Sequence, residues 1–194
     1  MEKPRNYDNT QSYGNYEPIP SGNYTLIILN VEETVSTTNK PMLKINLDVK
    51  EGEQRGRFTQ EYNNDTRQNK KWPCQYFQLI YDRDGNCSRG FKTFINSVAI
   101  SNPGFDPNSI WGDHFESNFK RMVIGGGFRR EQYKNDKGEL KWSTKCYTLF
   151  PVEEVSTRPK PEDKPLDPTP EYMNSTKSWS TGDYNEGNRL PWDD

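Results

Sequence analysis

Residues 41–52 read PMLKINLDVKEG and carry the clearest pattern in this chain of 194 residues. One face of the pattern collects its apolar members, which are Leu43, Ile45, Leu47 and Val49. The other face collects its polar members, which are Lys44, Asn46, Asp48 and Lys50. A period of two residues is typical of a β-strand with one buried and one solvated side. We therefore expect a strand here with its apolar face against a core.

The segments on either side of this strand predict two more. Residues 21–33 (SGNYTLIILNVEE) are dense in residues that favour strands. Residues 56–62 (GRFTQEY) also alternate, and we expect the third strand there. Its two faces carry the pairs Phe58 with Tyr62 and Arg57 with Glu61.

A helix follows an irregular stretch. In residues 70–86, Pro73 interrupts an aromatic run, which favours loop and irregular strand ending in a turn. Residues 88–101 predict a helix that Ser88 can cap and that the NPG sequence at 102–104 ends. Its apolar residues recur at helical spacing, and they are Phe91, Phe94, Ile95 and Val98.

The last predicted elements form a hairpin. Residues 121–133 read as a strand whose centre is the glycine triplet 125–127, and we favour a bend or bulge there over close approach of a ligand. A turn at 135–138 and a returning strand in 139–155 follow. Three strands, a helix and a hairpin match a mainly β fold, the five-stranded OB-fold Greek-key barrel with its helix between strands three and four. Other small α+β folds share this order.

Composition favours one domain with extensions. Only 30% of residues are hydrophobic and the mean hydropathy is −1.14, so a single core is expected. We expect a flexible arm over residues 1–20 and the folded domain over 21–155. Half of the fourteen prolines lie in 151–194, so residues 156–194 predict a disordered, Pro-rich tail, which holds eight Asp/Glu against five Lys/Arg.

Signals for catalysis are weak. The only histidine is His114, and no nucleophile motif accompanies it, so a non-enzymatic protein is expected. The three cysteines lack metal-site spacing, which predicts free thiols and neither a metal nor a cofactor. No signal peptide or membrane-spanning run is seen, so we expect a cytoplasmic protein with no membrane partner.

Positive charge and aromatic residues coincide in two windows. Residues 40–92 hold eleven Lys/Arg against seven Asp/Glu, and residues 120–145 hold eight against three. Cations that follow phosphates and flat rings that stack on unpaired bases are what single-stranded nucleic acid requires. Some of these rings must instead fill the core, and we assign Phe91, Phe94, Tyr147 and Phe150 to it. The candidate nucleic-acid-binding residues are Lys44, Asn46, Arg55, Arg57, Phe58, Tyr62, Lys70, Lys71, Trp72, Arg129, Arg130, Tyr133 and Trp142.

An OB barrel would arrange these candidates around one cleft. Its ligands lie across strands two and three, between the loop joining strands one and two and the loop joining strands four and five. These loops are expected at residues 34–40 and 131–139. Lys44 and Asn46 would then form a platform with Arg57 or Phe58.

Several blocks of the chain resemble a phage-encoded family. They are TNKPMLKINLDVKEGEQRGRF, KKWP, FKTFINSVAISNPGF and VIGGGFRREQYKNDKGE, and the resemblance covers about residues 20–155. Members of this family, long catalogued as a domain of unknown function, are regarded as single-stranded DNA-binding proteins encoded near phage replication and recombination genes. The resemblance implies an OB-fold and a role in coating unpaired DNA in the cytoplasm of the infected bacterial host.

The chain ends in a tip that is similar to another feature of such proteins. Bacterial single-stranded DNA-binding proteins end in an acidic, hydrophobic tip that docks on replication and repair enzymes. The tip here shares the ingredients but not their order, since its residues are Leu190, Pro191, Trp192, Asp193 and Asp194. It predicts docking on phage or host replication and recombination proteins, with competition for the basic cleft as the alternative.

These observations lead to one expected function and one alternative. We expect sequence-independent binding of single-stranded DNA during phage replication and recombination. The alternative is a protein-interaction adaptor whose OB-like barrel binds a peptide. The sequence is compatible with a homo-oligomer and leaves the number of chains open.

Overall fold

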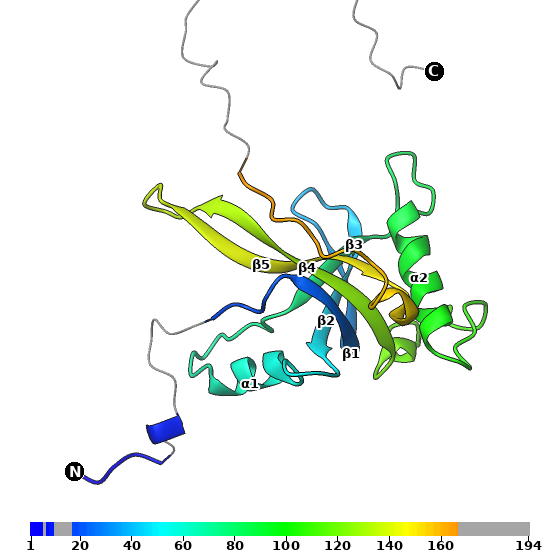
Figure 1. The fold of residues 1–194 in the computed structure, drawn as a ribbon. Helices are drawn as coiled ribbons and strands as arrows, with labels where there is room; N and C mark the ends of the chain where they lie inside the picture. The colour runs from blue at the N-terminus through cyan, green and yellow to red at the C-terminus, as the bar shows by residue number, and fades with distance from the viewer. Residues whose placement is uncertain (6, 10–16, 167–194) are drawn as a thin grey trace, which may run out of the picture.

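A five-stranded antiparallel sheet forms the body of the protein (Figure 1). The structure is a computed structural model and describes residues 1–5, 7–9 and 17–166. The strands are β1 (Gly22–Val35), β2 (Pro41–Val49), β3 (Gln75–Leu79), β4 (Val123–Lys134) and β5 (Leu140–Phe150). The helices are α1 (Arg57–Asn64) and α2 (Arg89–Ser101), with short 3-10 turns at Tyr7–Asn9, Glu116–Phe119 and Val152–Glu154. The expected mainly β class is confirmed.

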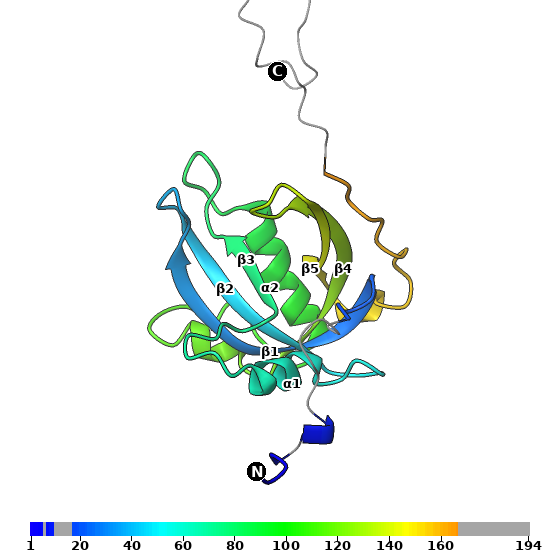
Figure 2. The ribbon, with the colours of Figure 1, turned by 90° about the vertical axis from the view of Figure 1, so that its left-hand side faces the viewer.

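The sheet has the strand order β3-β2-β1-β4-β5 and is open. Its two edge strands, β3 and β5, bring Cα atoms within 8 Å of each other, but no ladder of hydrogen bonds joins them in the described part of the chain. Helix α2 packs against β3, β4 and β5. Figure 2 shows the strands curving round from β3 to β5 with α2 between these edges. None of the described helices has the length and apolar character that a membrane span requires.

Strand β2 follows the alternation that its sequence predicts. Its apolar members Leu43, Ile45 and Leu47 are completely buried, and they join a single core cluster with residues of β1, β4 and α2. Lys44 and Asn46 stand on the opposite, partly exposed face. Asp48 breaks the pattern, because it is buried with 3% of its surface exposed.

The third strand does not lie where the sequence predicts it. Residues 57–64 form helix α1, which begins after Gly56 in the left-handed conformation at φ 68°. The buried carboxylate of Asp48 accepts hydrogen bonds from the amides of Phe58 at 3.0 Å and Thr59 at 3.1 Å, so it holds the first turn of the helix. The prediction is wrong because side chains four residues apart share a face in a strand and also in a helix.

The true third strand is β3, inside the stretch that Pro73 interrupts. β3 pairs with β2 from Met42 opposite Leu79 to Asn46 opposite Gln75. The proline therefore precedes the strand instead of breaking it, since a strand tolerates proline at its start.

Helix α2 confirms the prediction for residues 88–101. The Ser88 hydroxyl accepts a hydrogen bond from the Phe91 amide at 3.1 Å and caps the first turn. The helix ends before Asn102, whose side chain donates to the Val98 and Val123 carbonyls. All four of its predicted apolar residues are buried.

Close strand packing explains the glycine triplet of β4. A Cβ at Gly125 would lie 2.6 Å from the Phe150 ring, and a Cβ at Gly126 would lie 2.4 Å from Leu26. The ladder with β5 also shifts register between Gly127 and Phe128. The expected hairpin is confirmed, with a bulge at the glycines. Tyr147, expected in the core, is 37% exposed.

Both predicted extensions are in part attached to the domain. Near the N-terminus Ile19 is buried, with 2% of its surface exposed. Residues 156–166, which we call the strap, run back along the sheet, and Pro161 within them is buried. The expected start of a disordered tail at residue 156 is therefore wrong for these residues. Residues 167–194 lie outside the described residues.

The strap covers an edge of β4 that β1 leaves open. β1 begins opposite Phe128, so the remainder of β4 has no partner from β1. There the Gln132 amide donates to the Lys164 carbonyl at 2.9 Å, and the Lys164 amide donates to the Arg130 carbonyl at 2.8 Å. These bonds form a short parallel bridge between Glu131 and Lys164. An edge that would otherwise expose backbone donors and acceptors is thereby paired.

Candidate nucleic-acid interface

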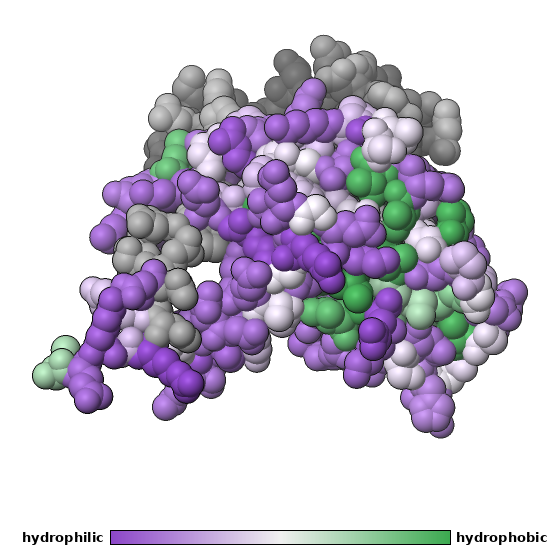
Figure 3. Space-filling view, turned by 60° about the horizontal axis from the view of Figure 1, so that its bottom comes forward, coloured by the Kyte–Doolittle hydropathy of each residue, from purple (hydrophilic) through white to green (hydrophobic). Residues whose placement is uncertain are grey.

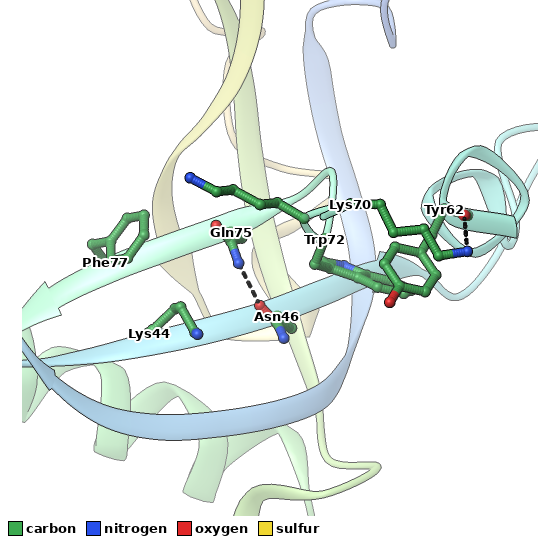
Figure 4. A pocket seen from close by; sticks show the side chains of 8 residues that line it. Lys44, Asn46, Tyr62, Lys70, Trp72, Gln75 and Phe77 are labelled. Atoms are coloured by element: carbon green, nitrogen blue, oxygen red, sulfur yellow. Dashed lines mark hydrogen bonds between the residues drawn. The ribbon is translucent and has the colours of Figure 1, made fainter. Parts of the chain in front are cut away.

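A hollow of about 450 Å³ lies on the outer face of β2 and β3. Its walls combine cationic, aromatic and amide side chains: Lys44, Asn46, Tyr62, Lys70, Lys71, Trp72, Gln75 and Phe77. Figure 4 shows Phe77 at one end, Tyr62 and Trp72 at the other, and Asn46 with Gln75 between them. We call this site the β2–β3 hollow.

The ladder between β2 and β3 sets the floor of the hollow. Lys44 stands opposite Phe77, and Asn46 stands opposite Gln75, so all four side chains share one face. The Gln75 amide nitrogen donates to the Asn46 side-chain oxygen at 3.2 Å (Figure 4). Phe77 is 50% exposed, and its ring stacks on no other described aromatic ring. It therefore offers a flat, accessible surface.

The other end of the hollow is fixed by several contacts. The Trp72 indole nitrogen donates to the Leu47 carbonyl at 2.8 Å. The Tyr62 ring lies 5.1 Å from the Trp72 ring, at an angle of 38°. The Lys70 ammonium lies 4.3 Å from the centre of the Tyr62 ring and donates to the Tyr62 carbonyl at 3.0 Å. These contacts hold the two rings in place without a ligand.

The three lysines of the hollow differ in their surroundings. Lys44 forms an ion pair with Glu32. Lys70 is anchored on Tyr62, as described above. Lys71 is exposed and forms no ion pair with another described residue. It is thus the cation most available to an anionic ligand, because no carboxylate has to be displaced from it.

The structure brings six of the thirteen predicted residues together in this hollow. They are Lys44, Asn46, Tyr62, Lys70, Lys71 and Trp72. The prediction missed Gln75 and Phe77 because it placed the third strand at residues 56–62. The alternation of Gln75, Tyr76 and Phe77 directly after Pro73 was the available signal, since it resembles a strand that begins behind a proline.

Three predicted residues lie around α1 in other roles. Phe58 is buried with 4% exposure and stacks on Phe128, so its assignment to the interface is wrong. Arg57 pairs with Glu61 at 2.8 Å and also donates to the Glu17 carbonyl. Arg55 is exposed beside the start of the helix. The expected platform of Lys44 and Asn46 with Arg57 or Phe58 is therefore wrong, and Gln75 and Phe77 stand in that place.

The four remaining predicted residues lie on the hairpin of β4 and β5, outside the β2–β3 hollow. Arg129 pairs with Glu131 at 2.8 Å and lies 4.3 Å from the centre of the Tyr147 ring. Arg130 pairs with Asp163 of the strap and lies 5.3 Å from the centre of the Trp142 ring. Tyr133 and Trp142 are 43% and 41% exposed.

Ionisation on this side of the molecule follows from the ion pairs. The hydrogen bond from Arg130 lowers the pKa of the Asp163 carboxyl below its ordinary value. The same contact raises the pKa of the Arg130 guanidinium. Both groups are therefore charged at neutral pH, and the contact is a true ion pair.

The described residues hold no group of three or more His, Cys, Asp or Glu side chains placed to bind a metal ion. The three cysteines are unpaired, with Cys74 buried and Cys87 exposed. Figure 3 shows a largely hydrophilic surface on the face that comes forward from the bottom of Figure 1, with hydrophobic residues gathered on one side of it.

Comparison with known proteins finds a similar family. Residues 5–79 match a family described as "Protein of unknown function (DUF669)". The matched part contains all eight residues of the β2–β3 hollow. No curated protein matches the chain. The similarity thus includes the whole hollow.

Proposed function

We propose that this protein binds single-stranded DNA independently of sequence, as a binding protein and not as an enzyme. The observation that carries the proposal is the β2–β3 hollow, where three lysines, three aromatic rings and two amides line one surface. Lysines attract phosphates, and aromatic rings stack on bases at roughly 1–3 kcal/mol per base. A role in phage replication or recombination rests on the resemblance of the sequence alone.

We further propose that the sheet is of the OB type. An OB barrel joins strands one to five in the order 1-2-3-5-4-1, so opening it between strands three and five leaves the order seen here. The position of α2 between β3 and β4, and its packing against both edge strands, supports this assignment. In OB-folds, oligonucleotides bind across strands two and three, which is where the hollow lies.

Binding would begin with charge and continue with stacking. Lys71 is exposed and would contact a phosphate without first breaking an ion pair. Phe77 offers an exposed ring at one end of the hollow, and Trp72 is already oriented at the other end by its bond to Leu47. Because Trp72 is oriented before binding, little of its side-chain entropy is lost when a base stacks on it.

The amides of Asn46 and Gln75 favour unpaired bases. Each amide carries a donor and an acceptor, and every base presents both kinds of group on its edge. A 180° turn of an amide exchanges its donor and acceptor, so the pair can adapt to any base. In a duplex the Watson–Crick edges are already paired. The floor of the hollow therefore supports preference for single strands without preference for sequence.

Fluorescence anisotropy of labelled oligo-dT and of its duplex, at low and high salt, tests the proposal. We expect salt-sensitive binding of the single strand and weaker binding of the duplex. Phe77→Ala removes an exposed ring and should weaken binding about 5- to 150-fold, the equivalent of ~1–3 kcal/mol. Trp111→Ala is its matched control, because Trp111 is 58% exposed and lies outside the hollow.

A second pair of variants tests the charge. Lys71→Gln should weaken binding and reduce the log–log salt slope by about 0.7. Lys92→Gln removes an exposed lysine of α2 that lies outside the hollow, and it should change little. The proposal is wrong if neither single-stranded nor duplex DNA binds the folded protein. It is also wrong if each variant of the hollow binds DNA as tightly as its own control. Peptide binding then becomes the leading hypothesis.

Docking of the C-terminal tip on other proteins stays a prediction. The residues concerned, 190–194, lie outside the described residues.

A further inference from the structure

A second hollow, which the function proposed above does not use, lies between the start of β1, β4 and the strap. It measures about 420 Å³, and its walls are Pro20, Ser21, Arg130, Lys160, Pro161 and Asp163. Two cations and one carboxylate therefore meet in it. The carboxylate belongs to the strap, and the Arg130 guanidinium belongs to the sheet.

Asp163 is held in this hollow as an anion. The Arg130 side chain donates two hydrogen bonds to one Asp163 carboxylate oxygen, one of them from Nε at 3.0 Å. The Ser21 hydroxyl lies 3.4 Å from the other oxygen. Guanidinium groups bind carboxylates and phosphates through the same fork of N–H donors. The position that Asp163 occupies thus suits a phosphate equally well.

We propose that Arg130, Lys160 and Ser21 form a second phosphate position for the bound DNA strand, and that Asp163 occupies this position in the unbound protein. The inference rests on the function proposed above. A strand that binds here displaces the carboxylate of Asp163 and leaves a phosphate oxygen on the Arg130 guanidinium.

Exposure of the ion pair makes this exchange energetically accessible. The side chains of Arg130 and Asp163 are 52% and 34% exposed. An exposed ion pair contributes little, because water and salt screen it. A backbone phosphate carries the same single negative charge as a carboxylate. It can replace the carboxylate because it is covalently part of an already bound strand, which raises its effective concentration at this position.

The strap does not depend on Asp163 for its place. Pro161 is buried, and the Asn23 side chain donates to the Arg158 carbonyl at 2.9 Å. The backbone bridge to β4 adds two hydrogen bonds through Lys164. The strap and the other residues that line the hollow therefore stay in place when the Asp163 carboxylate is released.

An aromatic ring next to Arg130 completes the argument for a nucleic-acid ligand. Trp142 lies beneath the guanidinium at 5.3 Å, and 41% of its surface is exposed. A phosphate on Arg130 would hold the neighbouring base near this ring. A free anion would make no use of the ring, whereas a strand would.

Asp163→Asn tests the proposal, because it keeps the shape of the side chain and removes the charge. Its matched control is Glu162→Gln, which removes the same charge from the exposed neighbouring residue. Anisotropy with labelled oligo-dT should show that Asp163→Asn binds about two- to fivefold more tightly than Glu162→Gln. The log–log salt slope should also become steeper by about 0.7.

Each variant is also made with Arg130→Gln, which separates the specific contact from general charge. The additional gain from Asp163→Asn should vanish in this background. Equal affinities of Asp163→Asn and Glu162→Gln, or a gain that persists without Arg130, would overturn the proposal. Failure of the function proposed above gives a different result, because the wild-type protein would then bind no oligo-dT at all.

NMR of the Arg130 Nε–H group distinguishes a strand from a free anion. In Asp163→Asn, oligo-dT should shift this signal at concentrations where inorganic phosphate, matched for total phosphate, does not. An equal shift by inorganic phosphate would show that the hollow binds free anions, and it would contradict the proposed binding of a DNA strand there.

Discussion

Asp48 departs from the pattern of β2, and it thereby places α1. Its carboxylate lies in the interior and accepts hydrogen bonds from the amides of Val49, Phe58 and Thr59. Two of these amides begin the helix, where the first four N–H groups have no partner within the helix. Since α1 carries Tyr62, one buried residue of β2 positions a wall of the β2–β3 hollow.

Asp48→Ala should lower the free energy of unfolding by about 1–3 kcal/mol, because buried amides lose their acceptor. Urea unfolding followed by circular dichroism measures the loss. Glu53→Ala removes an exposed acid nearby and should leave the midpoint unchanged. Equal midpoints for the two variants would mean that the carboxylate does not stabilise α1.

The cysteines should differ in reactivity, since only the thiolate reacts with alkylating reagents. Burial raises the pKa of Cys146 to about 12 and raises that of Cys74 as well. A raised pKa keeps both thiols protonated at pH 8, whereas Cys87 is exposed. Mass spectrometry after iodoacetamide treatment at pH 8 should find one label, on Cys87, and three labels in urea. Labelling of Cys146 in the folded protein would contradict its raised pKa.

Gly125→Ala should destabilise the protein by about 1–3 kcal/mol through overpacking. The added Cβ would lie 2.6 Å from the Phe150 ring and 3.0 Å from the Phe150 carbonyl oxygen, and the backbone oxygen has little freedom to move. Gly22→Ala is the control in a neighbouring strand, because its nearest contact would be an ordinary 3.5 Å. Thermal unfolding of both variants gives the comparison, and equal melting temperatures would show that the packing here is loose.

At the level of elements, the strap completes the sheet where β1 ends. It pairs the edge of β4 that would otherwise present the Arg130 carbonyl and the Gln132 amide to solvent. Unpaired strand edges promote association with other chains. The strap thus both stabilises the hairpin and lines the second hollow.

Shortened chains test the contribution of the strap. A chain of residues 1–166 should unfold at the same urea concentration as the full chain. A chain of residues 1–155 should lose about 1–3 kcal/mol, because two backbone hydrogen bonds and the burial of Pro161 are removed. Analytical ultracentrifugation should also show more association of the shorter chain. If the two shortened chains behave alike, the strap contributes neither stability nor protection.

At the level of the whole molecule, the two hollows occupy different parts of the sheet. One lies on β2 and β3, and the other lies between the start of β1, β4 and the strap. A single domain of the OB type covers roughly 4–16 nucleotides. Titration of tryptophan fluorescence with oligo-dT of increasing length should reach its saturating length within that range. Quenching that keeps growing well beyond it would indicate that several copies of the chain bind side by side.

Local sequence determined the elements whose patterns have one physical meaning. The alternation in β2 predicted a strand with one buried face. Ser88 and the apolar spacing that follows it predicted the start of a helix, and both elements are present. The glycine triplet likewise predicted a bend or bulge, and the ladder with β5 shifts register between Gly127 and Phe128. Five residues of the β2–β3 hollow followed from charge and aromatic content, and Asn46 followed from its place on the polar face of β2.

Tertiary structure alone decided the rest. Residues 56–62 have a spacing that suits a strand and a helix equally, and the choice came from the distant carboxylate of Asp48. Phe77 and Gln75 joined the hollow because β3 pairs with β2. Asp163 met Arg130 because the strap returns to an edge of β4 that β1 leaves open. Each of these outcomes depends on a contact between residues far apart in the chain, and no local pattern encodes such a contact.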